Sequence, residues 1–211
     1  MKLREKSFLP LPNKIGPPLD SPFFLRNTLK VARELLGKGL FIQHSSKRFL
    51  CELVEVEAYL GACDEASHSF RGMTPRNQSM FEEGGTAYVY FTYGFHFCLN
   101  VATEKKGVGA AVLFRAAIPL LGLEEMQKNR KLRGPLDPKK LLSGPAKLTQ
   151  ALGINKAFNG QKMNQAQFKI VDLGRVLSKS AIGTSSRIGI SKGQEHLYRF
   201  FVKNSPWLSR K

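Results

Sequence analysis

The pattern of apolar and polar residues predicts a helix followed by a β-hairpin in the first third of the chain. Asp20 can cap a helix whose first turn contains Pro22, and apolar residues continue at helical spacing as far as Gly37. Two strand-like runs, residues 40–44 and 48–59, flank a short polar turn. We expect the helix to pack against the sheet that these strands begin.

Farther along the chain, the pattern predicts more short strands with few helices between them. Residues 86–91 and 95–101 are rich in aromatic and apolar side chains, and the intervening Thr92-Tyr93-Gly94 provides a turn. The other predicted elements are strands at 109–116, 168–172, 187–190 and 198–203 and helices at 120–131 and 145–153. Since hairpins dominate over βαβ units, we predict an α+β fold with a curved, mostly antiparallel β-sheet and surrounding α-helices.

The chain is predicted to consist of one domain preceded by an arm. Residues 1–20 are rich in proline, lysine and glycine and lack periodicity, which indicates a flexible, basic N-terminal arm. Residues 21–211 show no convincing internal boundary, and their length fits a single domain. Within this domain, we expect the basic, proline-containing stretch 128–140 to form a mobile surface loop.

The charge balance points to a partner that is a polyanion. The sequence has 33 Lys and Arg against 16 Asp and Glu, and 42% of its residues are hydrophobic. This composition supports a packed core and a broadly positive surface, which favours nucleic acid as the partner. An anionic membrane, or a basic soluble protein with no polyanionic partner, remains as an alternative.

The cysteines and the possible metal ligands of the sequence predict neither a disulfide framework nor a metal site. Cys51, Cys63 and Cys98 form no CxxC pair, so we expect a reducing compartment, with neither a disulfide framework nor a zinc ribbon. Cys63 and His68 could be two metal ligands, but no second pair completes a site, so no metal is expected. Prolines interrupt the apolar residues after the basic N-terminus, and no apolar run reaches transmembrane length, so we expect a soluble protein.

Two glutamates stand out in the predicted strand 48–59. Strict alternation places Glu55 and Glu57 on one face with Cys51 and Leu53, in a half-buried strand otherwise suited to a protein core. A buried carboxylate without a partner is costly. The two residues therefore either lie on a solvated face of the strand or serve a function that their sequence context must reveal.

That context is a series of motifs in a fixed order. They are VEVEAYLG (54–61), DEASH (64–68), TPRN (74–77), YVYFTYGFHFCLNV (88–101), VLFRA (112–116) and SGPAKL (143–148). In order and spacing they resemble the alkyladenine (3-methyladenine) DNA glycosylase family, and the resemblance runs from about residue 23 to residue 207. It implies a single domain that inserts a protruding β-hairpin into the DNA minor groove and uses no metal or organic cofactor.

The resemblance assigns the catalytic chemistry to Glu57 and Arg115. Breaking an N-glycosidic bond builds positive charge on the sugar, so a carboxylate beside C1′ both stabilises that charge and deprotonates an attacking water. Glu57 matches the general base of the family. Arg115 matches a residue that helps to hold the same water, and its proximity would keep Glu57 ionised. The alternative for Arg115 is an ion pair at a sheet edge.

The resemblance also assigns a pocket for the damaged base. Tyr59, His68 and Tyr90 match the residues that sandwich the flipped base, and electron-rich rings attract the positive charge of an N-alkylated purine. Asn100 matches an amide that disfavours the amino group of ordinary guanine. Taken singly, the two tyrosines could be core aromatics, His68 a surface histidine and Asn100 a strand-end hydrogen-bonding residue.

The tip of the predicted hairpin carries the residues expected to contact DNA. Tyr93 matches the residue that fills the hole left by the extruded nucleotide, although a tyrosine in a turn can also pack locally. Phe95 and His96 flank it and are weaker candidates for minor-groove contact, because the family commonly has Met and Tyr there.

The predicted function is therefore base excision repair by a monofunctional, monomeric hydrolase acting on double-stranded DNA. We expect it to flip alkylated or deaminated purines of the 3-methyladenine, 7-methylguanine, hypoxanthine and ethenoadenine class and to leave an abasic site. The expected location is the cytoplasm, with the nucleoid, if the source is bacterial, and the nucleus if it is eukaryotic. The alternative is a non-catalytic basic protein that binds DNA or RNA on the same scaffold.

Overall fold

The computed structural model describes residues 15–92, 94 and 96–210. Within these residues nine strands form one sheet in which all paired strands are antiparallel. The strands are β1 (Gly39–His44), β2 (Lys47–Tyr59), β3 (Ala87–Thr92), β4 (His96–Thr103), β5 (Ala110–Leu121), β6 (Asn164–Gln165), β7 (Phe168–Val171), β8 (Ile182–Ser185) and β9 (Arg199–Val202). Their order is β3-β4-β5-β2-β1-β7-β6, and the β8–β9 hairpin joins the sheet through pairing of β9 with β2.

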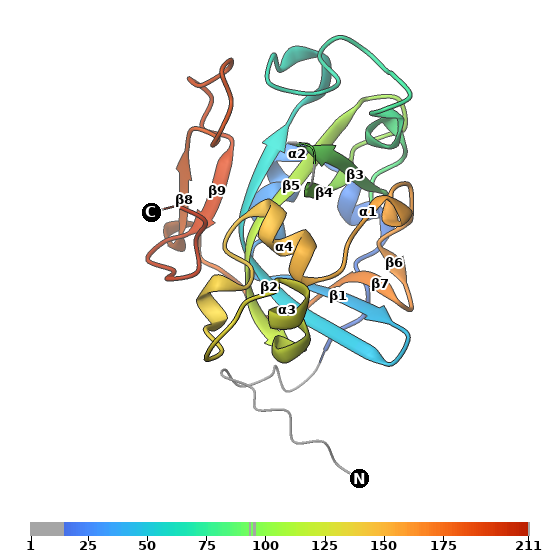
Figure 1. Ribbon diagram of the computed structural model, residues 1–211. Coiled ribbons are helices and arrows are strands. Elements are labelled where there is room, and N and C mark those ends of the chain that lie inside the picture. Colours follow the sequence, from blue (N-terminus) through green and yellow to red (C-terminus); the bar gives the residue numbers. More distant parts are fainter. Residues whose placement is uncertain (1–14, 93, 95, 211) are drawn as a thin grey trace.

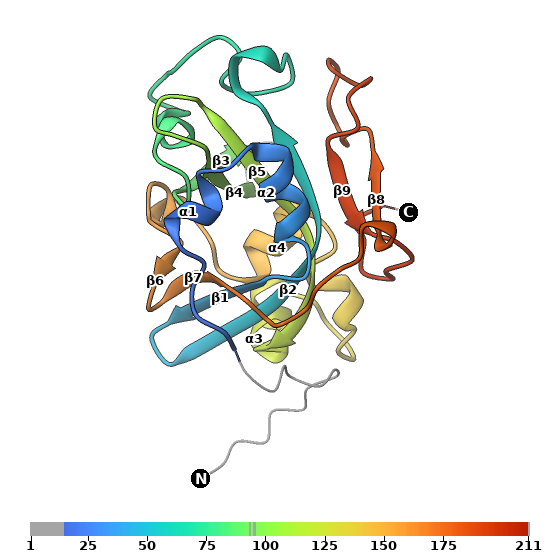
Figure 2. The same cartoon turned by 180° about the vertical axis from the view of Figure 1, so that it is seen from behind.

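Short helices cover the curled sheet. They are α1 (Ser21–Phe24), α2 (Thr28–Leu35), α3 (Leu123–Asn129) and α4 (Pro145–Ala151), with single 3-10 turns at Gly61–Cys63, Gln78–Phe81, Pro138–Lys140, Lys156–Phe158 and Lys179–Ala181. Figure 1 shows α3 and α4 on the near side of the long strands β2 and β5. Figure 2, the view from behind, shows α1 and α2 on the opposite side. The predicted α+β class with a curved antiparallel sheet is confirmed.

The central strand β2 is covered on both faces, which explains why it is buried along nearly its whole length. Leu53 and Val56 belong to the main core with residues of α2 and α4. Leu50 and Val54 pack in a second cluster, against which Trp207 and Leu208 near the C-terminus are placed. The expected half-buried strand is thus a fully interior one.

An irregularity in the middle of β2 decides which way its glutamates point. Leu53 pairs with Ala117, Glu55 with Ala116 and Val56 with Phe114, so Val54 and Arg115 are extra residues at two register shifts. Such bulges change the alternation of side chains and re-aim them. The expectation that Glu55 and Glu57 share a face with Cys51 and Leu53 was therefore wrong: Val56 and Ala58 take that face instead.

Both edges of β2 are also paired with other strands. β1 pairs with its first half as far as Glu52, and β9 takes over opposite residues 55–57. The strand β5 pairs along the other edge. Edge pairing satisfies the backbone of β2, and because both faces are covered as well, a charged side chain there needs a partner from the protein.

Three predicted elements differ from the structure. The first predicted helix is broken: α1 ends at Phe24 and α2 starts at Thr28, where the side chain of Asn27 accepts a hydrogen bond from the Leu29 N–H. The predicted helix 120–131 begins only at Leu123, because residues 120 and 121 extend β5. No strand occupies residues 187–190, since β8 ends at Ser185.

The hairpin that was predicted around Tyr93 is formed by β3 and β4, which pair from Ala87 opposite Val101 to Thr92 opposite His96. Gly94 has a φ of 75°, in the left-handed region that a tight turn requires. Tyr93 and Phe95 lie outside the described residues.

The predicted N-terminal arm and the predicted loop 128–140 both contact the rest of the domain where the structure describes them. Residues 1–14 of the predicted arm lie outside the described part, whereas Gly16 and Leu19 donate backbone hydrogen bonds to the carbonyls of Asp172 and Ile170 beside β7, each at 2.8 Å. In the predicted loop 128–140, Arg130 donates to Gln150 at 2.7 Å. Across residues 15–92, 94 and 96–210, no helix is long and apolar enough to cross a membrane.

Gly109, just before β5, offers a test of this packing. Its φ is 73°, and a Cβ there would lie 2.6 Å from the Phe81 ring. Gly109→Ala is expected to lower the free energy of unfolding by about 2–4 kcal/mol, from backbone strain together with the clash. Gly107 also has a positive φ but nothing within 4 Å of its Cβ position, so Gly107→Ala should cost only about 1 kcal/mol. Equal losses in urea unfolding would contradict the packing described here.

Candidate active site

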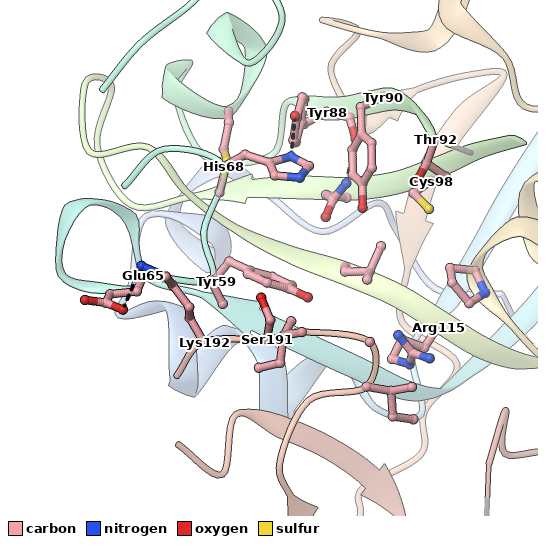
Figure 3. Close-up of a pocket in the computed structure, with 18 of the residues that line it drawn as sticks. Tyr59, Glu65, His68, Tyr88, Tyr90, Thr92, Cys98, Arg115, Ser191 and Lys192 are labelled. Atoms are coloured by element: carbon pink, nitrogen blue, oxygen red, sulfur yellow. Dashed lines mark hydrogen bonds and ion pairs between the residues drawn. The ribbon is translucent and has the colours of Figure 1, made fainter. Parts of the chain in front are cut away.

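A pocket of about 380 Å³ opens between the C-terminal end of β2, the strands β3 to β5 and the loop 188–192 (Figure 3). Its wall is largely aromatic and polar. The lining residues are Tyr59, Glu65, Ala66, His68, Arg76, Met80, Tyr88, Tyr90, Thr92, Cys98, Asn100, Leu113, Arg115, Pro145, Ile188, Gly189, Ile190, Ser191 and Lys192. Five of the predicted site residues, Tyr59, His68, Tyr90, Asn100 and Arg115, are thus brought together.

His68 and Tyr90 form one aromatic wall, and Tyr59 lies across the opening from them in Figure 3. The His68 and Tyr90 rings meet edge to face, with centroids 4.6 Å apart. Nδ1 of His68 is 2.9 Å from the Tyr88 hydroxyl. Burial, together with nearby Arg76, lowers the pKa of His68, so the imidazole is neutral near pH 7. The walls of the slot are therefore uncharged rings.

Asparagines hold this wall in place. Asn100 donates through Nδ2 to the Tyr88 carbonyl at 3.0 Å, which fixes the orientation of its amide within the pocket. Asn77 donates to the His68 carbonyl at 2.8 Å and accepts from the Thr74 N–H at 2.6 Å. Asn77 of the TPRN motif thus holds the backbone of His68 in place.

Glu57 lies behind the pocket rather than on its surface, and its side chain is 0% exposed. Oε1 accepts from the Ile188 N–H at 2.7 Å, and Oε2 accepts from the Tyr59 hydroxyl at 3.0 Å. Arg115 Nη1 is 3.3 Å from Oε2. Burial raises the pKa of Glu57 even though the positive charge of Arg115 opposes the rise. The carboxylate can therefore take up a proton more readily than an exposed glutamate.

Arg115 bridges two buried carboxylates. Its Nε donates to Glu55 at 3.1 Å while Nη1 faces Glu57. Burial alone would lower the pKa of Arg115, but the charges of Glu57 and Glu55 outweigh it and raise the pKa. Because β5 lies between β4 and β2, this contact is in the sheet interior rather than at an edge.

Glu55, which the sequence singled out with Glu57 but to which it assigned no specific role, accepts four hydrogen bonds. Oε1 accepts from Arg115, from Arg199 Nε at 2.8 Å and from the Ser209 hydroxyl at 2.7 Å, and Oε2 accepts from the Ser209 N–H at 2.6 Å. Burial would raise the pKa of Glu55, but the hydrogen bonds from Ser209 and Arg199 outweigh it and lower the pKa. Glu55 therefore remains ionised.

A second buried ion pair fixes the loop that closes the pocket. Arg187 donates to the two Asp64 oxygens at 2.5 and 2.7 Å and to the Ala58 carbonyl at 2.9 Å. Its guanidinium carbon lies 4.6 Å from the centre of the Tyr59 ring. This pair places the backbone N–H of Ile188 where it can reach Glu57. The sequence did not predict this pair, since residues 187–190 resembled a strand.

The remaining candidates are separated from the pocket. His96 starts β4 and, like Cys63, is not among the described residues that line the pocket. Among the described side chains, no cluster of three or more His, Cys, Asp and Glu could hold a metal ion. Lys192 lines the pocket and lies 3.5 Å from Glu65, an arrangement that the sequence did not suggest.

Comparisons with known proteins agree on one family. A family model described as "Methylpurine-DNA glycosylase (MPG)" matches residues 22–206. A protein of Chlorobium phaeovibrioides named "Putative 3-methyladenine DNA glycosylase" is 45% identical over 193 residues, which cover 91% of this chain and 96% of that protein. Proteins with the same name from Prosthecochloris aestuarii and Francisella tularensis subsp. tularensis are 44% and 42% identical, over 89% and 87% of this chain and 89% and 94% of their own lengths.

The Asp64–Arg187 pair should be essential for stability. Burial would raise the pKa of Asp64, but Arg187 and backbone N–H groups outweigh it and lower the pKa. Asp64→Asn leaves the Arg187 charge uncompensated and is expected to cost about 2–4 kcal/mol of unfolding free energy at pH 7. This loss should shrink as the pH falls below about 4, because Asp64 of the unfolded chain takes up a proton there, whereas the folded carboxylate does so only at a lower pH. Glu65→Gln removes a more exposed partner, and urea unfolding that shows equal losses in both variants would contradict this assignment.

Proposed function

The chain belongs to the methylpurine-DNA glycosylase family, and we propose that it hydrolyses the N-glycosidic bonds of alkylated and deaminated purines in duplex DNA, with Glu57 activating the water. As a member of this family it is a DNA glycosylase, a hydrolase that acts on DNA. The observation that carries the mechanism is the buried Glu57–Arg115 pair behind an aromatic pocket. A protein that only bound nucleic acid would have no use for a buried carboxylate with a raised pKa at this place.

The slot between Tyr59 and the His68–Tyr90 wall suits a flipped purine. The volume of about 380 Å³ lies in the usual range of small-molecule pockets. A positively charged N-alkylated purine gains about 0.5–2 kcal/mol from each electron-rich ring face. A neutral His68 adds no repulsion. These features support 3-methyladenine and 7-methylguanine as substrates, with hypoxanthine and ethenoadenine entering by stacking alone. Asn100, held by Tyr88, would disfavour the amino group of normal guanine.

Glu57 would act by removing a proton from water as the bond to the base breaks. The water oxygen bonds to C1′, its proton passes to the carboxylate, and the electron pair of the broken bond leaves with the base. A cationic N-alkylated purine departs as a neutral molecule, because its positive charge is cancelled by that pair. Hypoxanthine and ethenoadenine, which are neutral in DNA, leave as anions and take up a proton from water. Both Glu57 oxygens already accept hydrogen bonds, so the attacking water must compete with Tyr59 and Arg115 at Oε2.

The β3–β4 hairpin is the element that would hold the nucleotide outside the stack. Tyr90 on β3 lines the pocket, and Tyr93 follows three residues later in the sequence, between the end of β3 and the start of β4. A wedge at that position would lie next to the base that it displaces. We assign this role to Tyr93, with Phe95 and His96 as neighbouring minor-groove contacts. The excess of Lys and Arg supports binding to duplex DNA. We further propose that the protein acts as a monomer, in the cytoplasm of a bacterium or the nucleus of a eukaryote.

Glu57→Gln should separate binding from chemistry. The amide preserves the shape but cannot accept the proton, so base release from a lesion duplex is expected to fall at least about a hundredfold while lesion binding persists. Single-turnover release of bases from methylated DNA, and from duplexes with one hypoxanthine or ethenoadenine, measures both the effect and the substrate range. Glu34→Gln, in an exposed ion pair, serves as the control. Near-normal release by the Glu57→Gln variant would rule out Glu57 as the base.

The pH dependence of excision should report the raised pKa of Glu57. Only the ionised carboxylate accepts a proton, so the rate is expected to decline on the acid side at a pH above the ordinary glutamate value of about 4.3. The measurement is the single-turnover rate from pH 4 upward, with binding followed in parallel. A rate that stays constant down to the pH at which the protein unfolds would contradict this assignment.

A further inference from the structure

The segment that follows β9 contacts the catalytic region through one residue, Ser209. Its hydroxyl donates to Glu55 Oε1 at 2.7 Å and lies 3.5 Å from Arg115 Nη2, from which it accepts. Its backbone N–H donates to Glu55 Oε2 at 2.6 Å. The neighbouring Trp207 and Leu208 pack against the apolar cluster of Leu50 and Val54, which anchors the segment on the sheet.

These contacts fix Arg115 from three directions. The guanidinium of Arg115 presents Nε to Glu55, Nη2 to Ser209 and Nη1 to Glu57. Because a guanidinium is planar, contacts at three nitrogens define both its position and its rotation. Ser209 supports two of these three contacts. It accepts from Nη2 directly, and it bonds to Glu55, which accepts from Nε.

The charges of the two buried glutamates provide a second reason for the contacts of Ser209. Glu55 and Glu57 are both 0% exposed, and two arginines, Arg115 and Arg199, compensate them. If Glu55 were less well satisfied, it would compete more strongly for Arg115 or take up a proton, and Arg115 would lose its fixed orientation toward Glu57. The two Ser209 donors prevent both outcomes without adding charge.

We propose that Ser209 is a positioning residue for base excision: it holds Glu55 and Arg115 so that Nη1 of Arg115 stays directed at Glu57. Ser209 does not touch the substrate, and it acts only through these two side chains. This inference depends on the proposed function of Glu57 and Arg115. It extends the catalytic machinery to a segment 94 residues beyond Arg115 in the chain.

The test is Ser209→Ala, which removes the hydroxyl but keeps the N–H donor. Loss of a hydrogen bond to a charged group predicts a single-turnover excision rate lowered about tenfold or more, with lesion binding unchanged. The acid side of the pH profile should also move to higher pH and become steeper, because Glu55 would then titrate together with Glu57. Ser209→Thr restores a hydroxyl and should recover both the rate and the profile.

Ser205→Ala is the matched control, because Ser205 lies in the same segment and its hydroxyl bonds only to the Trp207 N–H among the contacts described. It should leave the rate and the pH profile unchanged. Rates at saturating enzyme refer to DNA-bound, folded molecules, so a lower melting temperature does not obscure the result. A wild-type rate and profile in Ser209→Ala, or the same loss in Ser205→Ala, would overturn the proposal. Absence of base release by the wild-type protein would instead contradict the proposed function.

Discussion

Two ionised carboxylates in the interior of a β-sheet require partners that only distant parts of the chain can provide. The bulges at Val54 and Arg115 turn Glu55 and Glu57 away from the main core. An uncompensated buried charge costs several kcal/mol. Strand β5 therefore contributes Arg115, β9 contributes Arg199, the following segment contributes Ser209, and the loop after β8 contributes the Ile188 N–H.

The two glutamates lie two residues apart and yet have opposite pKa shifts. Glu55 has enough hydrogen-bond donors to lower its pKa, whereas Glu57 shares one arginine and remains dominated by burial, which raises its pKa. One carboxylate therefore serves as a permanent negative charge that orients Arg115, and the other can exchange a proton. Different environments for neighbouring carboxylates are a general way to assign separate roles to them.

Much of this arrangement could be predicted from the sequence, but not its long-range part. Alternating patterns and turn residues predicted the β1–β2 and β3–β4 hairpins, and the motifs predicted that Tyr59, His68, Tyr90 and Asn100 would gather at a pocket. Alternation failed at Val54, because a bulge has no clear sequence pattern. The Asp64–Arg187 and Glu55–Ser209 contacts span 123 and 154 residues, and no local pattern relates positions so far apart.

In the proposed reaction, water activated at Glu57 attacks the sugar directly. Lys192 at the pocket offers the competing chemistry, since an amine could attack C1′ and form a covalent Schiff base with the DNA. The direct test is single-turnover excision with borohydride present, because borohydride traps a Schiff base as a stable protein–DNA adduct. The proposed reaction predicts release of the base with no such adduct. A borohydride-trapped adduct formed at the rate of base release, and lost in Lys192→Ala, would contradict it.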